Sequence, residues 1–431
     1  MHAHPEPQYI PVVWITVAIV VGAVGVLIAL NLSTSERKIV RQVRSLYRAG
    51  DPQFVRSMGA LLGPSIVQGN TVDALYNGDQ IFPAMLSAIR SARVSITFET
   101  YIYWSGRIGR DFAEALGERA GAGVRVHVLL DWLGSGKMDE DVLDRMEAAG
   151  VEICRYHPLK WHTIGRLNNR THRKLLVVDG VVGFTGGVGI ADNWLGNAGD
   201  PDHWRDSHFR ITGPAVAQMQ ATFMDNWMKC RELVLHGVEY FPPLPASGEM
   251  AAQMFSSSPG AGSESVRLMY LLSIASAQES IRIANAYFVP DTLSVEELVT
   301  ARRRGVQVEI ITPGRHIDTG IVRKASRSRW GPLLEAGVEI YEYAPTMYHC
   351  KVMIVDDVWV SVGSTNFDNR SFRLNDEANL NILHADFARA QADAFEADKR
   401  QSRRITLDAW RRRPFSERML ERLAGTLRGQ L

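Results

Sequence analysis

An unbroken apolar segment stands near the start of the chain. No charged residue lies between Glu6 and Glu36, and residues 12–32 are apolar apart from Thr16 and Asn31. A helix rises about 1.5 Å per residue, so roughly 20 apolar residues cross the hydrocarbon core of a bilayer. We therefore predict one transmembrane helix. The alternatives are a buried core helix, which would usually show a polar face, and a cleaved signal peptide, for which a basic start and a small-residue cleavage site are missing.

Flanking charge gives an orientation for this helix. No Lys or Arg precedes it, whereas several basic residues follow it: Arg37, Lys38, Arg41, Arg44 and Arg48. The positive-inside rule then places the rest of the chain in the cytoplasm, attached to the plasma or inner membrane. The three cysteines, Cys154, Cys230 and Cys350, show neither a disulfide framework nor a zinc pattern. We expect them to be unpaired, which agrees with a reducing compartment.

Beyond the apolar segment, helical patterns alternate with β-rich runs, and the alternation occurs twice. Residues 94–101 resemble 280–287, residues 123–131 resemble 305–313, and residues 150–153 resemble 337–340. Such alternation predicts an α/β fold, and a repeat of this length is too long for a solenoid. We expect two similar α/β domains packed face to face.

The predicted boundaries follow from composition. The segments are a tail with the transmembrane helix (1–33), a basic juxtamembrane linker (34–66), a first domain (67–240), a linker rich in Pro, Gly and Ser (241–264), and a second domain with a basic tail (265–431). Membrane contact and a solvated helix face are both open for that tail.

A short motif recurs in equivalent places of the two halves. In each copy a Lys follows a His by two positions, an Asp follows the His by seven, and a small pair begins seven after the Asp. The first copy is His172, Lys174, Asp179 and Gly186-Gly187, and the second is His349, Lys351, Asp356 and Gly363-Ser364.

The spacing of this motif suggests chemistry on phosphate. Residues i and i+2 of a strand share a face, so each His projects beside its Lys. A neutral imidazole next to an ammonium group suits nucleophilic attack on a phosphate. A solvated strand face explains one such pair, but not two matched copies. Asp179-Gly180 is also a hairpin signal, so Asp179 and Asp356 fit a turn or supporting role as well as a catalytic one.

The two copies match the signature His-x-Lys-x4-Asp-x6-Gly-(Gly/Ser), by which the chain resembles the phospholipase D superfamily. Within it, the sequence is most similar to bacterial cardiolipin synthases over roughly residues 65 to 430. The segments that carry the likeness are 69–89, 99–104 (ETYIYW), 203–216, 285–291 (NAYFVPD), 337–343 and 363–380.

The resemblance implies one active site between the domains and a covalent phosphohistidine, with no metal or cofactor. It implies His172 as nucleophile and His349 as acid and base, although the symmetry of the sequence leaves this order open, with both lysines on the phosphate. Asn366 matches a phosphate-contacting residue, and Glu377 matches a carboxylate that orients a histidine. Asp206 is its counterpart in the first half. The chain departs from the family at Gly189, where Asn is usual, and backbone N–H groups from Gly186 to Gly189 are the expected replacement.

The implied reaction joins two phosphatidylglycerol molecules into cardiolipin and glycerol. A phospholipase D that uses water or another alcohol, a nuclease or other phosphodiesterase, and a lipid-binding protein without turnover are the alternatives. The net charge of +1 and the predicted membrane helix disfavour nucleic acid as a partner. Intact His and Lys in both halves disfavour a protein without turnover. The oligomeric state, the acceptor alcohol and the acyl preference stay open.

Overall fold

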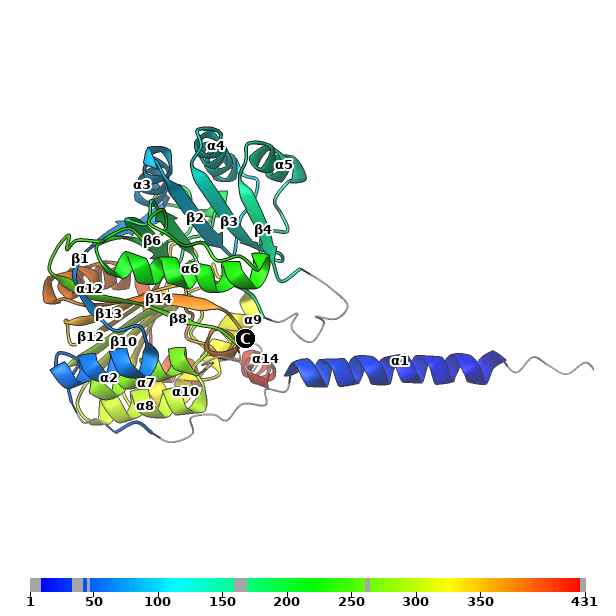
Figure 1. Cartoon of the computed structure of the whole chain (residues 1–431). Helices are drawn as coiled ribbons and strands as arrows, with labels where there is room; N and C mark the ends of the chain where they lie inside the picture. The colour runs from blue at the N-terminus through cyan, green and yellow to red at the C-terminus, as the bar shows by residue number, and fades with distance from the viewer. Residues whose placement is uncertain (1–8, 33–41, 45–46, 159–168, 260–263, 427–431) are drawn as a thin grey trace, which may run out of the picture.

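The computed structural model describes residues 9–32, 42–44, 47–158, 169–259 and 264–426 (Figure 1). The strands are β1 (Val67–Tyr76), β2 (Ser95–Thr100), β3 (Arg125–Asp131), β4 (Glu152–Tyr156), β5 (Leu175–Val178), β6 (Val182–Gly186), β7 (Ser207–Thr212), β8 (Met250–Ser257), β9 (Ser280–Asn285), β10 (Gln307–Pro313), β11 (Glu339–Tyr343), β12 (Lys351–Val355), β13 (Trp359–Gly363), β14 (Glu377–Leu383) and β15 (Ser402–Ile405).

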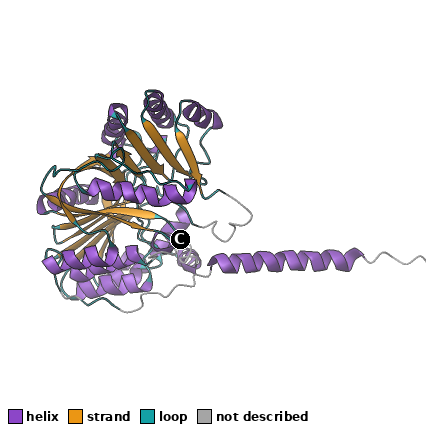
Figure 2. Ribbon diagram, viewed as in Figure 1, coloured by secondary structure: helices purple, strands orange, loops and turns teal. Residues whose placement is uncertain are grey.

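The helices cover this sheet and extend from it (Figure 2). They are α1 (Tyr9–Leu32), α2 (Pro52–Leu62), α3 (Asn77–Ser91), α4 (Arg107–Gly121), α5 (Glu140–Ala148), α6 (Ala215–Arg231), α7 (Ser265–Ser276), α8 (Thr292–Arg303), α9 (Gly320–Arg327), α10 (Trp330–Glu335), α11 (Asn369–Arg373), α12 (Ala385–Arg400), α13 (Leu407–Arg411) and α14 (Phe415–Thr426), with a 3-10 turn η2 (Asp192–Trp194).

All the strands belong to one sheet with an internal twofold order. From its centre, one half runs β1, β7, β6, β5, β2, β3, β4, and the other runs β8, β14, β13, β12, β9, β10, β11, followed by β15. Every strand of the first half thus has a counterpart, which confirms the predicted duplication and the α/β class. The expected face-to-face packing of two separate domains is wrong. The halves join edge to edge, because β1 and β8 pair antiparallel.

The repeated glycines explain why the two halves follow the same path. Gly123 ends the turn after α4 at a φ of +88°, and Gly305 does so after α8 at +99°. A residue with a side chain adopts this left-handed conformation at a cost, so glycine is favoured where a helix must stop and reverse. Each glycine leads into a parallel strand, β3 or β10.

Three large apolar clusters form most of the core. One lies under α3, α4 and α5, and another under α2, α7, α8 and α10. The third contains residues of both halves, among them Phe223 of α6, Leu380 of β14 and Phe395 of α12. This shared cluster makes the halves one structural unit around the place where their motifs meet.

Two predicted linkers contain regular structure. The stretch 241–264 includes β8, a strand beside the centre of the sheet, whose short sequence is hidden among Pro, Gly and Ser. The stretch 34–66 includes α2, which packs on the second half through Phe54, whose ring centroid lies 4.9 Å from that of Trp359. Phe54 and Met58, four residues apart, form the buried face of α2. The basic residues before the helix made the composition of the stretch resemble a linker.

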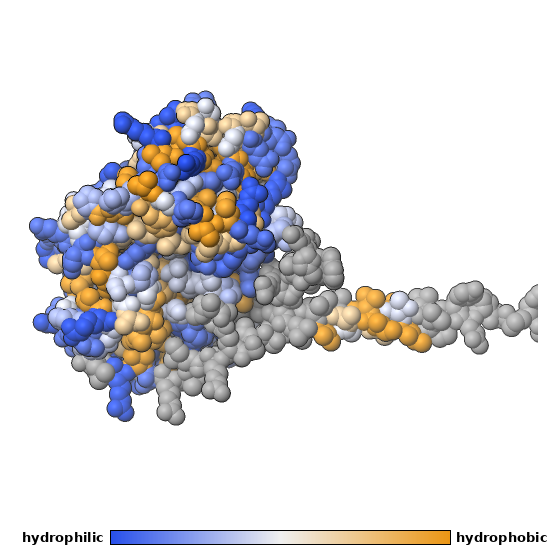
Figure 3. Space-filling model, in the orientation of Figure 1, coloured by the Kyte–Doolittle hydropathy of each residue, from blue (hydrophilic) through white to orange (hydrophobic). Residues whose placement is uncertain are grey.

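The helix α1 stands apart from the sheet and its covering helices (Figure 1). Apart from Thr16, its described side chains are apolar, and they are exposed, for example Trp14 and Val21 (Figure 3). Among the described residues, however, no helix meets both the length and the hydropathy of a membrane span. The structure therefore does not support the predicted transmembrane helix.

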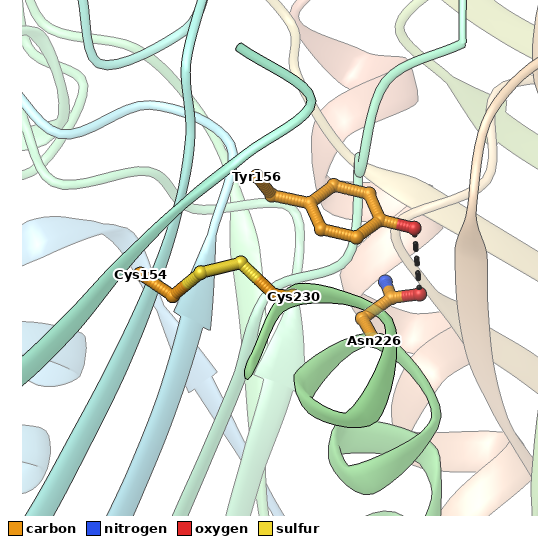
Figure 4. Close-up of a disulfide and its surroundings, with 4 residues drawn as sticks. All are labelled: Cys154, Tyr156, Asn226 and Cys230. Carbon is orange, nitrogen blue, oxygen red and sulfur yellow. Dashed lines mark hydrogen bonds between the residues drawn. A yellow bond between two sulfur atoms is a disulfide. The ribbon is translucent and has the colours of Figure 1, made fainter. Parts of the chain in front are cut away.

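The cysteines also differ from the prediction. Cys154 of β4 and Cys230 at the end of α6 form a disulfide, with 6.4 Å between their Cα atoms (Figure 4). The two positions are 76 residues apart in sequence, and only the packing of α6 beside β4 brings them together. Cys350 is free and buried. The expectation of three unpaired cysteines is thus wrong for two of them.

Candidate active site

A cavity of about 430 Å³ lies between the two halves, and both halves line it. Its volume is in the range of small-molecule sites. Four of its residues were singled out in the sequence, namely His172, Lys174, His349 and Asn366. The other lining residues include Tyr101, Trp104, Arg170, Trp194, Trp204, Tyr287, Asp318, Asp368 and Arg370.

The two histidines sit where the halves exchange backbone hydrogen bonds. His172 precedes β5, and its N–H donates to the carbonyl of Asp376 in the other half at 2.8 Å. His349 precedes β12, and its N–H donates to the carbonyl of Arg205 at 2.7 Å. Neither histidine can therefore be positioned by one half alone.

The supporting carboxylates cross between the halves in the same way. His172 Nδ1 lies 3.1 Å from both oxygens of Glu377, which belongs to the second half. His349 Nδ1 lies 2.7 Å from Oδ2 of Asp206, which belongs to the first half. A carboxylate at Nδ1 holds the proton there and leaves Nε2 as the second ring nitrogen, which in His349 lies 3.2 Å from Nζ of Lys351. The sequence indicated these two carboxylates but not this exchange of partners.

Burial sets the charge state of the nucleophile candidate. Removal from water lowers the pKa of His172 to about 4, although Glu377 opposes the shift. The same cause, with the charge of Lys351, lowers the pKa of His349. For Glu377 and Asp206, burial alone would raise the pKa, but the paired histidines together with the neighbouring lysines and hydrogen bonds outweigh it, and the pKa falls. At neutral pH His172 is thus a neutral imidazole on a carboxylate.

The two lysines lie close to their histidines, as the spacing predicts. Lys174 Nζ donates to the carbonyl of His172 at 2.7 Å, and Lys351 Nζ donates to that of His349 at 2.6 Å. Burial lowers the pKa of Lys174 to about 7, and it also lowers that of Lys351. Each ammonium group lacks a full counter-charge, so a bound phosphodiester would raise both pKa values and be held by both charges.

The small residues of the motif bring the carboxylates into place. A Cβ on Gly187 would lie 2.2 Å from Oδ1 of Asp206, and a Cβ on Gly186 would lie 2.6 Å from the backbone of Ser207. In the other half, a Cβ on Gly363 would lie 2.3 Å from the carbonyl of Ala378. Glycine is needed because β6 and β13 end in close contact with β7 and β14.

Ser364 has a different task. Its hydroxyl donates to Oε2 of Glu377 at 2.5 Å and accepts from the N–H of Ala378 at 3.0 Å. It therefore fixes the carboxylate that faces His172. The predicted alternation of side chains along each motif strand is also observed. Arg173 and Cys350, which lie between His and Lys in the two copies, are buried and do not line the cavity.

The two aspartates of the motif lie at the turns after β5 and β12. Asp179 accepts from the backbone N–H groups of Arg93, Val94 and Ser95, and Asp356 accepts in the same way from residues 278–280. Neither is among the residues that line the cavity. Of the two roles left open by the sequence, this geometry favours turn and support over catalysis.

The family asparagine differs between the halves for a steric reason. Asn366 lines the cavity, and its Oδ1 is buried without a hydrogen-bond partner among the described residues. At Gly189, a Cβ would lie 2.9 Å from Ile102 and 3.2 Å from the ring of Trp194. Trp194 occupies this space and donates from Nε1 to Asp206 at 2.9 Å. The backbone of Gly187 is no replacement donor, because its N–H binds the carbonyl of Ser207.

A buried polar network beneath His172 was not foreseen. Thr171 donates to Glu99 at 2.5 Å, and Asn226 of α6 donates to the same oxygen at 2.7 Å. Tyr156 of β4 in turn donates to Asn226 at 3.1 Å, next to the disulfide (Figure 4). Burial raises the pKa of Glu99 to about 7. Glu99 belongs to the ETYIYW segment, so its position was visible in the sequence but its partners were not.

The cavity has an aromatic side and a polar side. Trp194 and Trp204 lie with ring centroids 5.3 and 5.4 Å from that of His349. On the polar side, Asp318 lines the cavity together with Thr319, which directly precedes α9. The Tyr287 hydroxyl donates to Asp318 at 2.6 Å. Within the described ranges, no group of three or more His, Cys, Asp or Glu side chains is arranged to hold a metal ion.

Comparison with known proteins agrees with this geometry. The family model "Cardiolipin synthase, PLD-like domain" matches residues 85–227 and 270–399. "Cardiolipin synthase 1" of Bacillus anthracis is 36% identical over 361 residues, which cover 81% of this chain and 70% of that protein. "Probable cardiolipin synthase YwiE" of Bacillus subtilis (strain 168) is 35% identical over 364 residues, covering 84% and 72%.

A solved structure shares the fold at low identity. Phosphatidylserine synthase of Haemophilus influenzae Rd KW20 superposes with a TM-score of 0.67 at 13% identity, over 88% of this chain and all of that one. The duplicated motif, the crossed histidine–carboxylate pairs and these relatives lead to one conclusion. The chain is an enzyme of the phospholipase D superfamily and belongs to its cardiolipin synthase family.

Proposed function

We propose that this enzyme makes cardiolipin from two molecules of phosphatidylglycerol through a phosphatidyl group carried on His172. The observation that supports this most directly is the pair of histidines facing one cavity, each backed by a carboxylate of the other half. The named relatives are cardiolipin synthases, which supports the choice of lipid.

In the first step, Nε2 of His172 attacks the phosphorus of phosphatidylglycerol, and the P–O bond to the glycerol head group breaks. His349 gives a proton to the departing oxygen, so glycerol leaves as a neutral alcohol. Asp206, 2.7 Å from Nδ1, stabilises the imidazolium form that His349 must adopt before this transfer. Lys174, Lys351 and Asn366 hold the phosphate oxygens.

In the second step, His349 takes a proton from a hydroxyl of a second phosphatidylglycerol. The resulting oxygen attacks phosphorus, the P–N bond to His172 breaks, and cardiolipin forms. His172 suits the nucleophile because its low pKa keeps the ring neutral, with Glu377 accepting the Nδ1 proton at 3.1 Å. The short contact between His349 and Asp206 suits a histidine that first donates a proton to the leaving group and then accepts one from the incoming alcohol.

The test uses the full chain in detergent with phosphatidylglycerol as the sole lipid, and mass spectrometry of the products. We expect cardiolipin and glycerol in equal amounts. Phosphatidic acid without cardiolipin would make water the acceptor and refute the synthase. Quenching at alkaline pH and digestion should show a phosphatidyl group on the peptide that contains His172.

Matched variants separate chemistry from folding. His172→Ala and His349→Ala should each abolish product formation. Cys350→Ala is the control, because this buried residue lies next to His349 in sequence but does not line the cavity. It should keep most of the activity, and a loss there comparable to the histidine variants would contradict the assignment.

We also propose that α1 attaches the enzyme to the bilayer that holds its substrate. The exposed apolar side chains of α1, such as Trp14, Ile19 and Val21, support attachment. The basic residues that follow α1 in sequence favour a cytoplasmic position for the catalytic halves, whereas the Cys154–Cys230 disulfide is typical of oxidising compartments. Labelling of intact cells with a membrane-impermeant reagent, followed by peptide mapping, decides the side.

A further inference from the structure

The helix α14 presents an apolar stripe to solvent. Phe415, Met419 and Leu423 follow each other at intervals of four residues, and their exposed fractions are 71%, 49% and 58%. Leu420 widens the stripe, with an exposed fraction of 44%. Residues four apart lie on one face of a helix. A continuous apolar face of this kind on a surface helix indicates an interaction site.

The opposite face of α14 fixes the helix to the body. Glu421 is buried and accepts from Arg327 of α9 at 2.8 Å and from Arg413 at 2.9 Å. Ala424 is buried in a small cluster with Val322 and Ala325, both of α9. The stripe therefore belongs to a helix held in a defined orientation, with its apolar side turned outward.

The charge around the stripe indicates what it contacts. Residues 407–426 contain five arginines against Asp408, Glu417 and Glu421, a net charge of +2. Arg418 and Arg422 lie on α14 beside the stripe and are exposed, and the Arg418 guanidinium lies 5.9 Å from the ring of Phe415. An apolar face flanked by arginines matches the boundary between acyl chains and anionic head groups.

The position of α14 connects this face to the active site. Val322 of α9 packs against Ala424 and also lines the catalytic cavity, as does Thr319 just before α9. Ile321, between them, is exposed. One helix thus separates the apolar stripe from the cavity, and this helix forms part of the cavity wall.

We propose that α14 docks on an anionic phospholipid surface and thereby places the mouth of the cavity at the level of the lipid head groups. The proposal rests on the proposed function in that it supplies the route by which phosphatidylglycerol enters. It concerns a surface separate from α1, which would anchor the chain but would not orient the cavity.

The first test measures insertion of α14 directly. The full chain with Met419→Cys carries an environment-sensitive fluorophore, and vesicles contain phosphatidylglycerol with brominated acyl chains. Cys154 and Cys230 are paired and Cys350 is buried, so the new thiol is the accessible one. We expect strong quenching. Leu61→Cys on α2, a position whose side chain is more exposed than Met419, is the control and should stay unquenched. Absence of quenching at position 419 would overturn the proposal.

The second test separates docking from catalysis. The triple variant F415Q/M419Q/L423Q should turn over phosphatidylglycerol in vesicles about tenfold more slowly, since polar side chains lose the apolar transfer energy. Its rate on a short-chain, monomeric phosphatidylglycerol should equal that of the wild type. Equal loss on both substrates, or loss on neither, would overturn docking. Concentration-dependent self-association without lipid would assign the stripe to a second copy instead.

These outcomes are independent of the proposed reaction. If the wild type released phosphatidic acid instead of cardiolipin, the synthase would fail, but the ratio of vesicle to monomer rates would still report on α14. Conversely, cardiolipin formation with an unchanged ratio would leave the reaction standing and exclude the docking role. L61Q is the matched control and should change neither rate.

Discussion

The crossed carboxylates give the sharpest prediction, because each should affect the histidine of the opposite half. In Glu377→Gln, His172 loses a charged acceptor at 3.1 Å. The glutamine side chain fits this position. Its oxygen can replace Oε1, which accepts from the Asn375 amide, and its NH2 group can replace Oε2 and donate to the Ser364 hydroxyl, which at present donates. A hydrogen bond to a charged group contributes about 1.5–3 kcal/mol, so the rate should fall about 10- to 150-fold.

Asp206→Asn should cost more. Oδ2 of Asp206 accepts hydrogen bonds from Nε1 of Trp194 and Nδ1 of His349, and Oδ1 accepts one from the N–H of Ser207. Each oxygen of the carboxylate thus faces at least one donor, so the amide NH2 group must oppose a donor at whichever oxygen position it takes. The added cost of an unsatisfied buried group is about 1–3 kcal/mol.

The assay distinguishes the two roles by the leaving group. With phosphatidylglycerol, both variants should be slow. With a phosphatidyl ester of p-nitrophenol, whose departure needs no acid, release of nitrophenol should recover in Asp206→Asn but stay slow in Glu377→Gln. Recovery in Glu377→Gln alone would exchange the roles of His172 and His349. Recovery in both, with thermal unfolding unchanged, would refute the assignment of a nucleophile supported by a carboxylate.

Four further outcomes follow from the structure. Because burial lowers the pKa of His172 to about 4, its neutral form persists at mildly acidic pH, and protonation of this group should reduce kcat/KM only below about pH 4; a reduction centred near pH 6.5 would contradict this. Cys154→Ala should lower the free energy of unfolding by about 3 kcal/mol, measured by thermal melts. Reductant should lower the melting temperature of the wild type but not that of the variant. Gly189→Ala should reduce activity, measured by cardiolipin formation, because its Cβ would displace Trp194 from Asp206. Added chelator should leave the rate unchanged, and a chelator-sensitive rate would indicate a metal.

Local sequence patterns predicted a large part of this molecule. The alternation of helices and strands, the duplication and the paired His-Lys motif all depend on residues close together in the chain, where spacing alone fixes which side chains share a face. The hairpin signal at Asp179-Gly180 was readable for the same reason, and the structure places a turn there. Composition was less reliable, since it hid β8 in a stretch rich in Pro, Gly and Ser.

The tertiary structure decided whatever depends on contacts between distant segments. The sequence identified Glu377 and Asp206 but could not show that each supports the histidine of the other half, because that follows from the pairing of β1 with β8 and from the backbone bonds at His172 and His349. The Cys154–Cys230 pairing and the place of Trp194 over Gly189 have the same origin. Spacing along the chain fixes which side chains each motif brings together, whereas packing fixes which carboxylate supports which histidine.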